Sequence, residues 1–279
     1  MLNLAVSILN VAVLAGLVAG ILIVGIFVVV PAILRTGLSI SPLAARDWRE
    51  RVLLHYQNLC AEPGTPTLSG NFAWVFAWFK LRLDPMFGEL PGFLSAMPEI
   101  RSVLDIGCGY GVAGCALLEW RDELRIFGID PNAARARVAG AAFGSRGQAF
   151  CGLAPGFETP ELPDQFDAVF ILDVIHFIPD AAFDLTLRKI RSKMEPGGYL
   201  VIRAIIPPAD GGSWAWKFAK IQRALTGGRA FHRPVEKVRQ MISAAGFDVE
   251  KTEMSGGNPE MFWFIAGARR NEAGGSAPQ

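Results

Sequence analysis

A run of glycines between an apolar segment and a helical segment is the feature that most constrains this fold. Residues 103–111 read Val-Leu-Asp-Ile-Gly-Cys-Gly-Tyr-Gly. Glycine permits a tight turn and a close approach of the backbone to a ligand. The helix that follows offers unpaired N–H groups to a negative group. Asp130 ends the next predicted strand, where a carboxylate can accept hydrogen bonds from ribose hydroxyls. The pattern predicts a nucleotide-type ligand.

Short apolar runs alternate with helical segments from residue 101 onward. We expect strands at Ser102–Ile106, Arg125–Ile129, Gln148–Cys151, Ala168–Leu172 and Tyr199–Ala204. We expect helices at Val112–Trp120, Ala133–Ala142, Ala181–Lys193 and Val235–Ala245. The last two runs, Asp248–Met254 and Met261–Ala266, face each other across a glycine-containing turn. The order predicts an α/β domain with a doubly wound, mostly parallel sheet that a C-terminal β-hairpin closes.

The same loop also matches a dinucleotide fingerprint. The stretch Gly109-Tyr-Gly-Val-Ala-Gly114 fits the pattern G-x-G-x-x-G, and Asp130 lies at a distance that suits an NAD(P)-dependent oxidoreductase. However, Asp105 ends the strand at a point where dinucleotide sites usually carry apolar residues. The glycines also begin at Gly107, so the fingerprint starts too late. A closing hairpin fits this class poorly as well, so the oxidoreductase is kept as an alternative.

Several stretches together resemble the class I S-adenosylmethionine-dependent methyltransferases. The residues Asp105-x-Gly107-x-Gly109-x-Gly111 are similar to the first motif of that family, which cradles the methionine end of the cofactor. Asp130 is similar to its ribose-binding acid. Phe166–His176 resembles the fourth-strand motif of that family, and Glu195–Val201 resembles the turn into its fifth strand. Ala245–Phe247 resembles the end of the family's domain. The resemblance covers about residues 84–268 and implies a Rossmann-like fold with S-adenosylmethionine as the cofactor.

The resemblance also implies a set of cofactor contacts. They are expected from Asp105, Gly107, Cys108, Gly109, Gly111, Asp130, Pro131, Leu153 and Leu172. Many family members carry an acid after the third strand, whereas this chain reads Cys151-Gly-Leu-Ala154 there, so we expect backbone groups and Leu153 to contact adenine. More narrowly, three stretches resemble methyltransferase modules associated with lysophospholipid acyltransferases in bacterial lipid and aryl polyene pathways: Leu81–Phe87, Asp173–His176 and Phe231–Arg233.

The predicted chemistry needs few protein groups, because the enzyme has mainly to bring a nucleophile close to the methyl group and exclude water. His176 follows the fourth strand at the carboxyl edge and is the best candidate base; the alternative is a capping or packing histidine. Asp173 is expected to orient the cofactor or His176, or to be a helix N-terminal acid. Arg203 is a candidate for binding an anionic substrate group, or for a surface ion pair. His232 is a weaker second base candidate.

The first 34 residues contain no charged side chain, and Val11–Val30 is an unbroken apolar run of twenty residues. A helix of that length spans about 30 Å, the hydrocarbon thickness of a bilayer. A cleaved signal peptide would begin with a positive region and have a shorter apolar stretch, and a buried core helix is the other alternative. The arginines follow the run, at Arg35, Arg46, Arg49 and Arg51. We therefore expect a single-pass anchor in the inner membrane, with the catalytic domain in the cytoplasm.

Two further segments carry interleaved aromatic and basic residues. Residues 35–98 form a predicted connector, in which Asn71–Lys80 has Phe72, Phe76 and Phe79 on one face of a helix. An insert at about 207–231 includes Trp214–Arg223, which has the pattern of an amphipathic helix. Each segment suits a membrane surface, or packing on the domain as a helix or lid. The predicted methyltransferase domain covers residues 99–270, and the tail 271–279 is expected to be disordered.

Charge and composition limit the partners. A net charge of +1 gives no case for nucleic acid, and the four cysteines show no zinc-binding spacing, so no metal is expected. Gly16 and Gly20 could allow two membrane helices to dimerise. The sequence predicts a membrane-anchored methyltransferase that acts on an amphiphilic small molecule or lipid-linked acceptor, at oxygen. A cofactor-binding scaffold without turnover is the second alternative.

Overall fold

The computed structural model describes residues 47–57, 59, 67–157, 159–208 and 230–269. In the helix that begins at Thr67, side chains are described from residue 72 onward. The chain divides into two units, residues 1–81 and 82–279. The predicted anchor with Gly16 and Gly20, the segment Trp214–Arg223 and the tail lie outside the described residues. Within those ranges, no helix has both the length and the apolar character that a membrane crossing requires.

The first unit contains the helix α3 (Trp48–Gln57) and most of α4 (Thr67–Leu83). The predicted aromatic helix at 71–80 therefore exists, as the middle of a longer one. Its side chains divide by face: Trp74 is buried, whereas Phe76 and Phe79 are 37% and 46% exposed. The rings of Phe72 and Phe76 stack with their centroids 6.2 Å apart. The phenylalanine face of α4 is thus the more exposed one.

The second unit is built on a seven-stranded sheet within the described ranges, with the order β3-β2-β1-β4-β5-β7-β6. Its strands are β1 (Ser102–Ile106), β2 (Arg125–Asp130), β3 (Gly147–Cys151), β4 (Phe166–Leu172), β5 (Met194–Ile205), β6 (Phe247–Ser255) and β7 (Asn258–Ala268). The first five pair in parallel, and β7 lies antiparallel between β5 and β6. The predicted α/β fold with a mostly parallel sheet is confirmed, and the closing hairpin is present.

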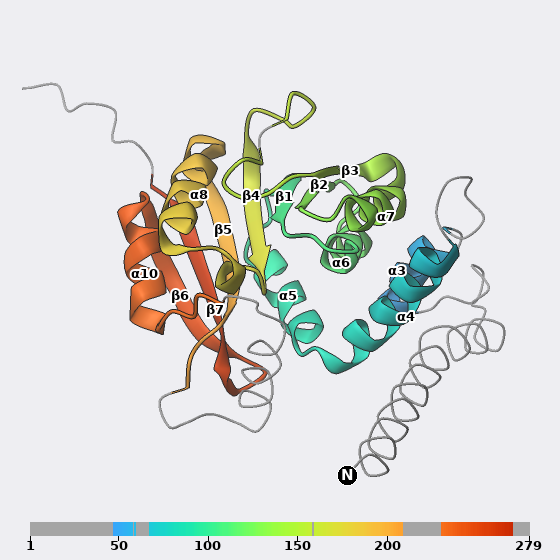
Figure 1. Ribbon diagram of the computed structural model, residues 1–279, viewed down its shortest axis with the longest axis horizontal. Helices are drawn as coiled ribbons and strands as arrows, with labels where there is room; N and C mark the ends of the chain where they lie inside the picture. Colours follow the sequence, from blue (N-terminus) through green and yellow to red (C-terminus); the bar gives the residue numbers. More distant parts are fainter. Residues whose placement is uncertain (1–46, 58, 60–66, 158, 209–229, 270–279) are drawn as a thin grey trace, which may run out of the picture. The chain divides into compact units, whose positions relative to one another are not determined.

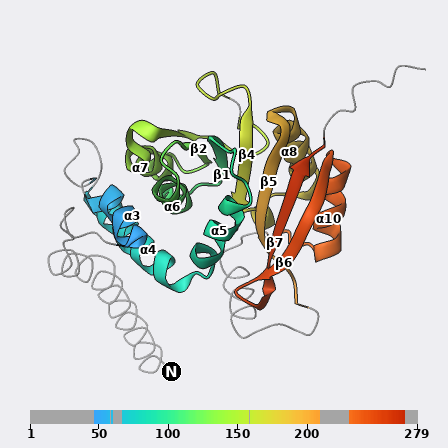
Figure 2. The same cartoon turned by 180° about the vertical axis from the view of Figure 1, so that it is seen from behind.

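Helices cover both faces of this sheet, as Figures 1 and 2 show. On one side lie α8 (Asp180–Ser192) and α10 (Val235–Ala244), which contact each other. On the other lie α6 (Val112–Trp120) and α7 (Ala133–Phe143), and α5 (Met86–Ser95) contacts α6. A buried apolar cluster joins α8 and α10 to the sheet, with Phe183, Leu187 and Ile242 among its members. This two-sided covering explains the long apolar runs of the parallel strands.

Glycines permit the close packing of α6 on α7. A Cβ atom on Gly114 would lie 2.5 Å from the ring of Phe143, and one on Gly111 would lie 2.8 Å from the same ring. Gly111 also has a φ of +80°, a left-handed conformation that side chains rarely adopt. The third glycine of the predicted motif therefore shapes the helix layer.

The closing hairpin turns through Gly256 and Gly257, whose φ angles are +59° and +68°. Positive φ at both central residues is typical of the tight turn that matches the twist of two antiparallel strands. A Cβ atom on Gly256 would lie only 2.6 Å from Cγ of Pro85, so the turn packs closely on the segment between α4 and α5. The C-terminal hairpin thereby contacts the start of the second unit.

The fifth strand begins earlier than expected. We expected Tyr199–Ala204, whereas β5 starts at Met194 because Phe166 pairs with Met194 before the register shifts. The shift accommodates Glu195–Gly198, and a Cβ on Gly198 would lie 2.8 Å from the carbonyl oxygen of Asp167. The expected domain boundary at residue 99 stays a prediction; the division found here falls after Leu81, so α5 belongs to the unit that holds the sheet.

Candidate functional site

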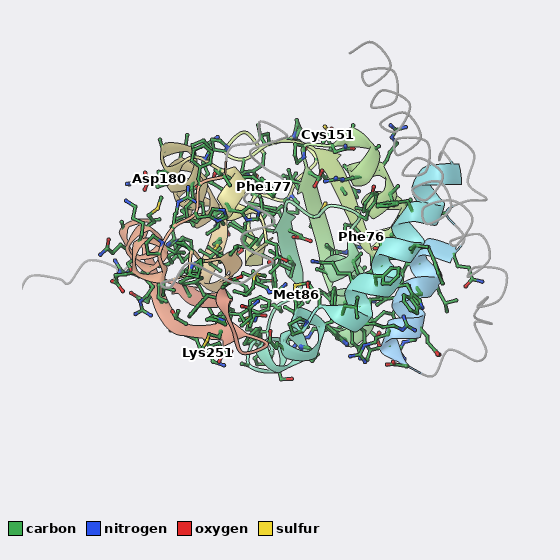
Figure 3. The ribbon with its side chains drawn as sticks, turned by 60° about the horizontal axis from the view of Figure 1, so that its bottom comes forward. Phe76, Met86, Cys151, Phe177, Asp180 and Lys251 are labelled. Carbon is green, nitrogen blue, oxygen red and sulfur yellow. The ribbon has the colours of Figure 1, made fainter. Side chains whose placement is uncertain are left out.

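A cavity of about 280 Å³ lies at the carboxyl ends of the central strands, where α/β proteins bind their ligands. Its walls come from the loop after β1, the end of β2, the loop after β3 and the segment after β4. In Figure 3 the labelled Cys151, at the end of β3, and Phe177, after β4, lie toward the same side of the ribbon. The edge predicted to bind a ligand therefore carries a cavity.

The glycine loop combines one crowded position with one open position. Gly107 has a φ of +81°, and a Cβ there would lie 2.3 Å from Cγ2 of Val174. Gly109 has a φ of +58°, and a Cβ there would meet nothing within 4 Å. The loop is held to the sheet because the N–H groups of Gly107 and Cys108 both donate to the carbonyl of Ile129. A ligand can therefore approach the backbone at Gly109.

Asp130 ties this loop to the start of α7. Its carboxylate is 4% exposed; Oδ2 accepts the N–H of Gly109 at 3.0 Å and Oδ1 accepts that of Asn132 at 2.8 Å. Asn132 in turn caps α7 by accepting two backbone N–H groups. Each carboxylate oxygen has more than one acceptor site, so Asp130 can hold the loop and still receive a hydroxyl from the cavity that it lines.

The structure brings six of the nine predicted cofactor-contacting residues together on the cavity wall: Gly107, Gly109, Asp130, Pro131, Leu153 and Leu172. Asp105, Cys108 and Gly111 are not on that wall. Asp105 is buried inside β1, and Gly111 faces Phe143. Their predicted contacts with the cofactor remain predictions. Val174, Phe177 and Arg135 also line the cavity, although no sequence pattern pointed to them as contacts.

Cys108 packs inward, toward the sheet. A Cβ on Gly128 would lie 2.7 Å from its sulfur atom, so the thiol fills the space that this glycine leaves. Burial raises the pKa of the Cys108 thiol well above its usual value, and the nearby carboxylates of Asp105 and Asp130 raise it further. The side chain is therefore a neutral thiol near pH 7, and it does not supply a nucleophile.

The cavity suits a ligand that joins an adenosine to an amino acid. Apolar walls at Ile129, Leu153 and Leu172 can face a base, and Asp130 offers a carboxylate for ribose hydroxyls. Leu153 is 64% exposed, so its side chain is available for the adenine contact predicted for it. The open backbone at Gly109 lies close to Asp130 and ahead of the N-terminus of α6. These residues fit S-adenosylmethionine.

The two predicted base candidates meet beside this cavity. His176 lies in the short helix η3 (Ile175–Phe177) and is 5% exposed. Its ring stacks on that of His232, with centroids 5.8 Å apart and planes 7° apart, and it contacts the ring of Phe177 at 4.0 Å. Val174, Phe177 and Ile178 line the cavity. His176 therefore lies within a turn that forms part of the cavity wall.

Arg233 fixes this turn, a role that the sequence analysis did not anticipate. Its guanidinium is 3% exposed and donates to the carbonyls of Ile175 and Ile178, and it pairs with Asp180 at 2.8 Å. The N–H of Phe231 also donates to the carbonyl of His176 at 2.7 Å. The Phe231–Arg233 stretch therefore holds η3 by donating hydrogen bonds to backbone carbonyls of residues 175–178. The sequence signals were the narrower resemblance of Phe231–Arg233 and the position of an arginine next to a candidate histidine.

Arg203 forms an ion pair, as one of its two expected roles had it, but the pair is buried rather than on the surface. The guanidinium, 3% exposed, is engaged by two carboxylates: Asp84 receives both terminal nitrogens at 2.9 and 2.8 Å, and Asp173 receives one at 3.0 Å. Its Nε donates to the hydroxyl of Ser255 at 3.1 Å. A cation that is buried and paired in this way is a poor receptor for an anionic substrate group, because the two carboxylates already occupy its donors. Asp173 itself lines the cavity.

A third carboxylate supports this cluster from α5. Glu89 accepts the hydroxyl of Ser255 and the indole N–H of Trp263, each at 2.7 Å, and also the N–H of Gly256. Trp263 lies 5.6 Å below the guanidinium of Arg203. The hairpin, α5 and β5 are therefore joined through polar side chains at one point. No sequence pattern pointed to this junction beyond the stretch Leu81–Phe87, which carried the narrower resemblance.

Comparison with known proteins agrees with this geometry. Residues 104–200 match the family described as a methyltransferase domain. The chain contains a methyltransferase domain. The matched residues, 104–200, begin inside β1 and end in β5, so they include the glycine loop, Asp130 and His176. This methyltransferase domain belongs to the S-adenosylmethionine-dependent class, as the sequence motifs predicted, and S-adenosylmethionine is the cofactor of that class. The narrower resemblance to lipid and aryl polyene pathway modules stays a prediction.

Two curated relatives match the methyltransferase domain and its surroundings. The phenazine O-methyltransferase of Lysobacter antibioticus is 28% identical over 155 residues, which is 54% of this chain and 44% of that protein. The tRNA U34 carboxymethyltransferase of Idiomarina loihiensis is 31% identical over 151 residues, or 49% and 40% of the two chains. The alignments thus span less than half the length of either relative.

Solved structures share the fold of the domain. Human N-acetylserotonin methyltransferase in complex with S-adenosylmethionine superposes with a TM-score of 0.55 at 17% identity, covering 80% of this chain and 57% of that one. Mitomycin 7-O-methyltransferase gives a TM-score of 0.55 at 21% identity, with 82% and 69% covered. At these identities the likeness concerns the fold alone, and it supports the Rossmann-like assignment.

Proposed function

We propose that this protein transfers a methyl group from S-adenosylmethionine to an oxygen of an amphiphilic small molecule or a lipid-linked acceptor. One observation carries the proposal. Asp130, on one wall of the cavity, offers a carboxylate for ribose hydroxyls, and another wall is formed by the turn that contains His176. Binding of the cofactor and removal of a proton can therefore take place at the same strand edge.

The cofactor, when bound, supplies a methyl group that its sulfonium already activates. The protein then has to place the acceptor oxygen beside it and exclude water. Phe177 and Leu153, 63% and 64% exposed, give the rim of the cavity an apolar surface that suits an amphiphile. His176 is suited to accept the proton of a phenol or alcohol.

The choice of oxygen rests on two supports. The imidazole beside the cavity is useful for an acceptor that must lose a proton, as a hydroxyl must. Two of the similar proteins, the phenazine and mitomycin enzymes, are O-methyltransferases by name. A nicotinamide cofactor has less support, because the domain belongs to the methyltransferase class.

Titration with S-adenosylmethionine tests the cofactor assignment. Asp130→Asn should weaken binding about ten-fold or more, because a lost hydrogen bond to a charged group costs about 1.5–3 kcal/mol. Isothermal titration calorimetry measures the change, with NADPH as the comparison ligand. Asp184→Asn on α8, whose carboxylate pairs with Arg188 at the surface, is the control. Equal affinity of the Asp130 variant and the unaltered protein would refute the assignment.

We also propose that the protein works at the inner membrane, with its catalytic domain in the cytoplasm. The apolar run at 11–30 and the arginines that follow it support this placement. The exposed phenylalanine face of α4 supports it independently, because Phe76 and Phe79 are followed closely by Lys80 and Arg82, which can meet lipid headgroups. Tethering would raise the local concentration of a membrane-bound acceptor. Dimerisation through Gly16 and Gly20 stays a prediction.

Removal of residues 1–34 should leave the affinity for S-adenosylmethionine unchanged, because the cavity lies wholly within the second unit. The truncated protein should still bind vesicles of anionic phospholipid weakly through α4. In that background, Phe79→Ser should reduce co-sedimentation with vesicles roughly five-fold, since it removes an apolar side chain from the lipid-facing surface. Leu185→Ser on α8, where the leucine is also 46% exposed, is the matched control. Equal effects of the two substitutions would argue against a membrane-facing α4.

A further inference from the structure

A second cavity, of about 430 Å³, lies in the unit that holds the sheet. One wall is the helix α5, and the other is the face of the strands β5, β7 and β6 that α5 covers. Among the described residues it shares no lining residue with the cavity that fits S-adenosylmethionine. In Figure 3 the labelled Lys251, on its β6 wall, lies well away from the labelled Cys151. Its volume suits a small organic ligand, and the proposed methyl transfer makes no use of it.

The charged side chains on this wall are not fully matched. Three carboxylates line the cavity, from Glu89, Glu250 and Glu253, together with the ammonium of Lys251. Glu253 pairs with Lys251 at 2.8 Å. Glu89 is joined through the hydroxyl of Ser255 to the cluster around Arg203 described above. Glu250 forms no ion pair with any residue that the structure describes, so its negative charge is the one that a ligand can match.

The backbone of β6 directs Glu250 onto the sheet. The pairing of β6 with β7 shifts register between Val249 and Lys251, so Glu250 lies at an irregularity of the kind that re-aims a side chain. A Cβ atom on Gly267 would lie 2.6 Å from Oε1 of Glu250. Gly267 is paired with Tyr199 on β5, whose side chain also lines the cavity. The missing side chain of this glycine therefore leaves room for the carboxylate beside the sheet.

An aromatic ring on α5 already receives a cation from the protein itself. Nζ of Lys251 lies 5.2 Å from the ring centroid of Phe93, within the range of a cation–π interaction. The side chains of Lys251 and Glu253 are 52% and 38% exposed, and an ion pair so close to water is weak. The ammonium of Lys251 can therefore turn to solvent when another cation arrives, and the ring and the carboxylate that it leaves become available.

We propose that this cavity binds a small organic cation, an amine with an apolar body. Its ammonium is attracted by the charge of Glu250, and its body packs on the aromatic and aliphatic wall that Phe93, Tyr199 and Ile265 provide. Lys251 is an internal competitor, which leaves as the ligand enters. In the part of the chain that the structure describes, no group of carboxylate, imidazole or thiol side chains is arranged to hold a metal ion, which favours an organic cation.

Three probes with a similar apolar body test the preference for charge. The first, 2-phenylethylamine, is a cation near pH 7, whereas 2-phenylethanol is neutral and 3-phenylpropionate is an anion. Methyl NMR spectra of the full chain locate binding, because Met97 and Ile265 both line the cavity. The amine should shift both methyl signals and bind at least five-fold more tightly than the alcohol. The anion should leave the signals unchanged.

Four substitutions test the wall. Glu250→Gln should weaken binding of the amine about five-fold and leave binding of the alcohol unchanged. Lys251→Met should strengthen binding of the amine roughly three-fold, because the competing ammonium is gone. Gly92→Leu should abolish binding of every probe, since Gly92 lines the cavity and a Cβ there meets nothing within 4 Å. Gly88→Leu is the matched control, because a Cβ there also meets nothing, on the same helix but away from the cavity.

The outcomes divide clearly. Opposite effects of Glu250→Gln and Lys251→Met on the amine, with binding lost in Gly92→Leu and kept in Gly88→Leu, would establish the site. Absence of methyl shifts with the amine, equal binding of the three probes, or a change in the same direction for the two charge variants would overturn the inference. Undiminished binding by Gly92→Leu would overturn it as well, because the amine would then bind elsewhere. Titration with S-adenosylmethionine tests the proposed function separately.

Discussion

Replacement of Arg203 with methionine is expected to lower the free energy of unfolding by about 3–5 kcal/mol, the usual cost of removing one partner from a buried ion pair. The substitution would leave two carboxylates, Asp84 and Asp173, facing each other while 16% and 23% exposed. Ser255 would also lose the donor that now bonds its hydroxyl. Urea denaturation at neutral pH measures the change through the transition midpoint and slope.

A surface pair provides the comparison. Arg188→Met on α8 removes an arginine whose partner Asp184 is one helical turn away and whose side chain is 59% exposed. Water screens such a pair, so no large change is expected. Addition of Asp84→Asn to Arg203→Met should restore part of the stability, because it removes one of the unbalanced charges. Similar losses for the two arginine variants would contradict the pairing described for Arg203.

Replacement of His176 with alanine is expected to lower kcat about 10²–10⁴-fold, the usual contribution of a positioned general base. The affinity for S-adenosylmethionine should change little, since the imidazole is not part of the cavity wall. Transfer of the radiolabelled methyl group to a series of phenols measures the effect. His55→Ala in α3, the remaining histidine of the chain, should leave kcat unchanged.

The phenol series separates a base from a packing residue. Phenols with a lower pKa lose their proton more easily, so the defect of the His176 variant should shrink as the acceptor becomes more acidic. His232→Ala should give a smaller defect, because His232 contacts the ring of His176 rather than the cavity. A defect of constant size across the series would mean that His176 only packs the turn, the alternative that its burial leaves open.

The parts of the fold that follow from local sequence were predicted well. The strand β1 and the helix α6 begin and end where expected; Gly107 marks the end of β1, and Gly111 marks the start of α6. Asp130 was identified because a carboxylate at the end of a strand has a definite place in this fold. In each case the signal lies within about ten residues of the structure that it predicts.

The charged cluster could not be predicted in the same way. Asp84 and Arg203 are 119 positions apart, and each looks like an ordinary charged residue beside a helix or strand. Arg203 was expected either to bind an anionic substrate group or to form a surface ion pair, since the partner that buries it comes from a distant turn. The stacking of His176 on His232 is a similar case, because both were candidates but nothing in the sequence indicated that they meet.

The antiparallel pairing of β7 with β5 has a consequence for biosynthesis. The chain emerges from the ribosome in order, so residues 102–205 can form their five parallel strands before the hairpin exists. Until residues 258–268 arrive, β5 has an open edge, and its central residues Leu200–Ile202 are among the most apolar of the sheet. Open apolar edges invite pairing with other chains. The strand β7, which is made after the five parallel strands, therefore also protects the nascent domain from aggregation.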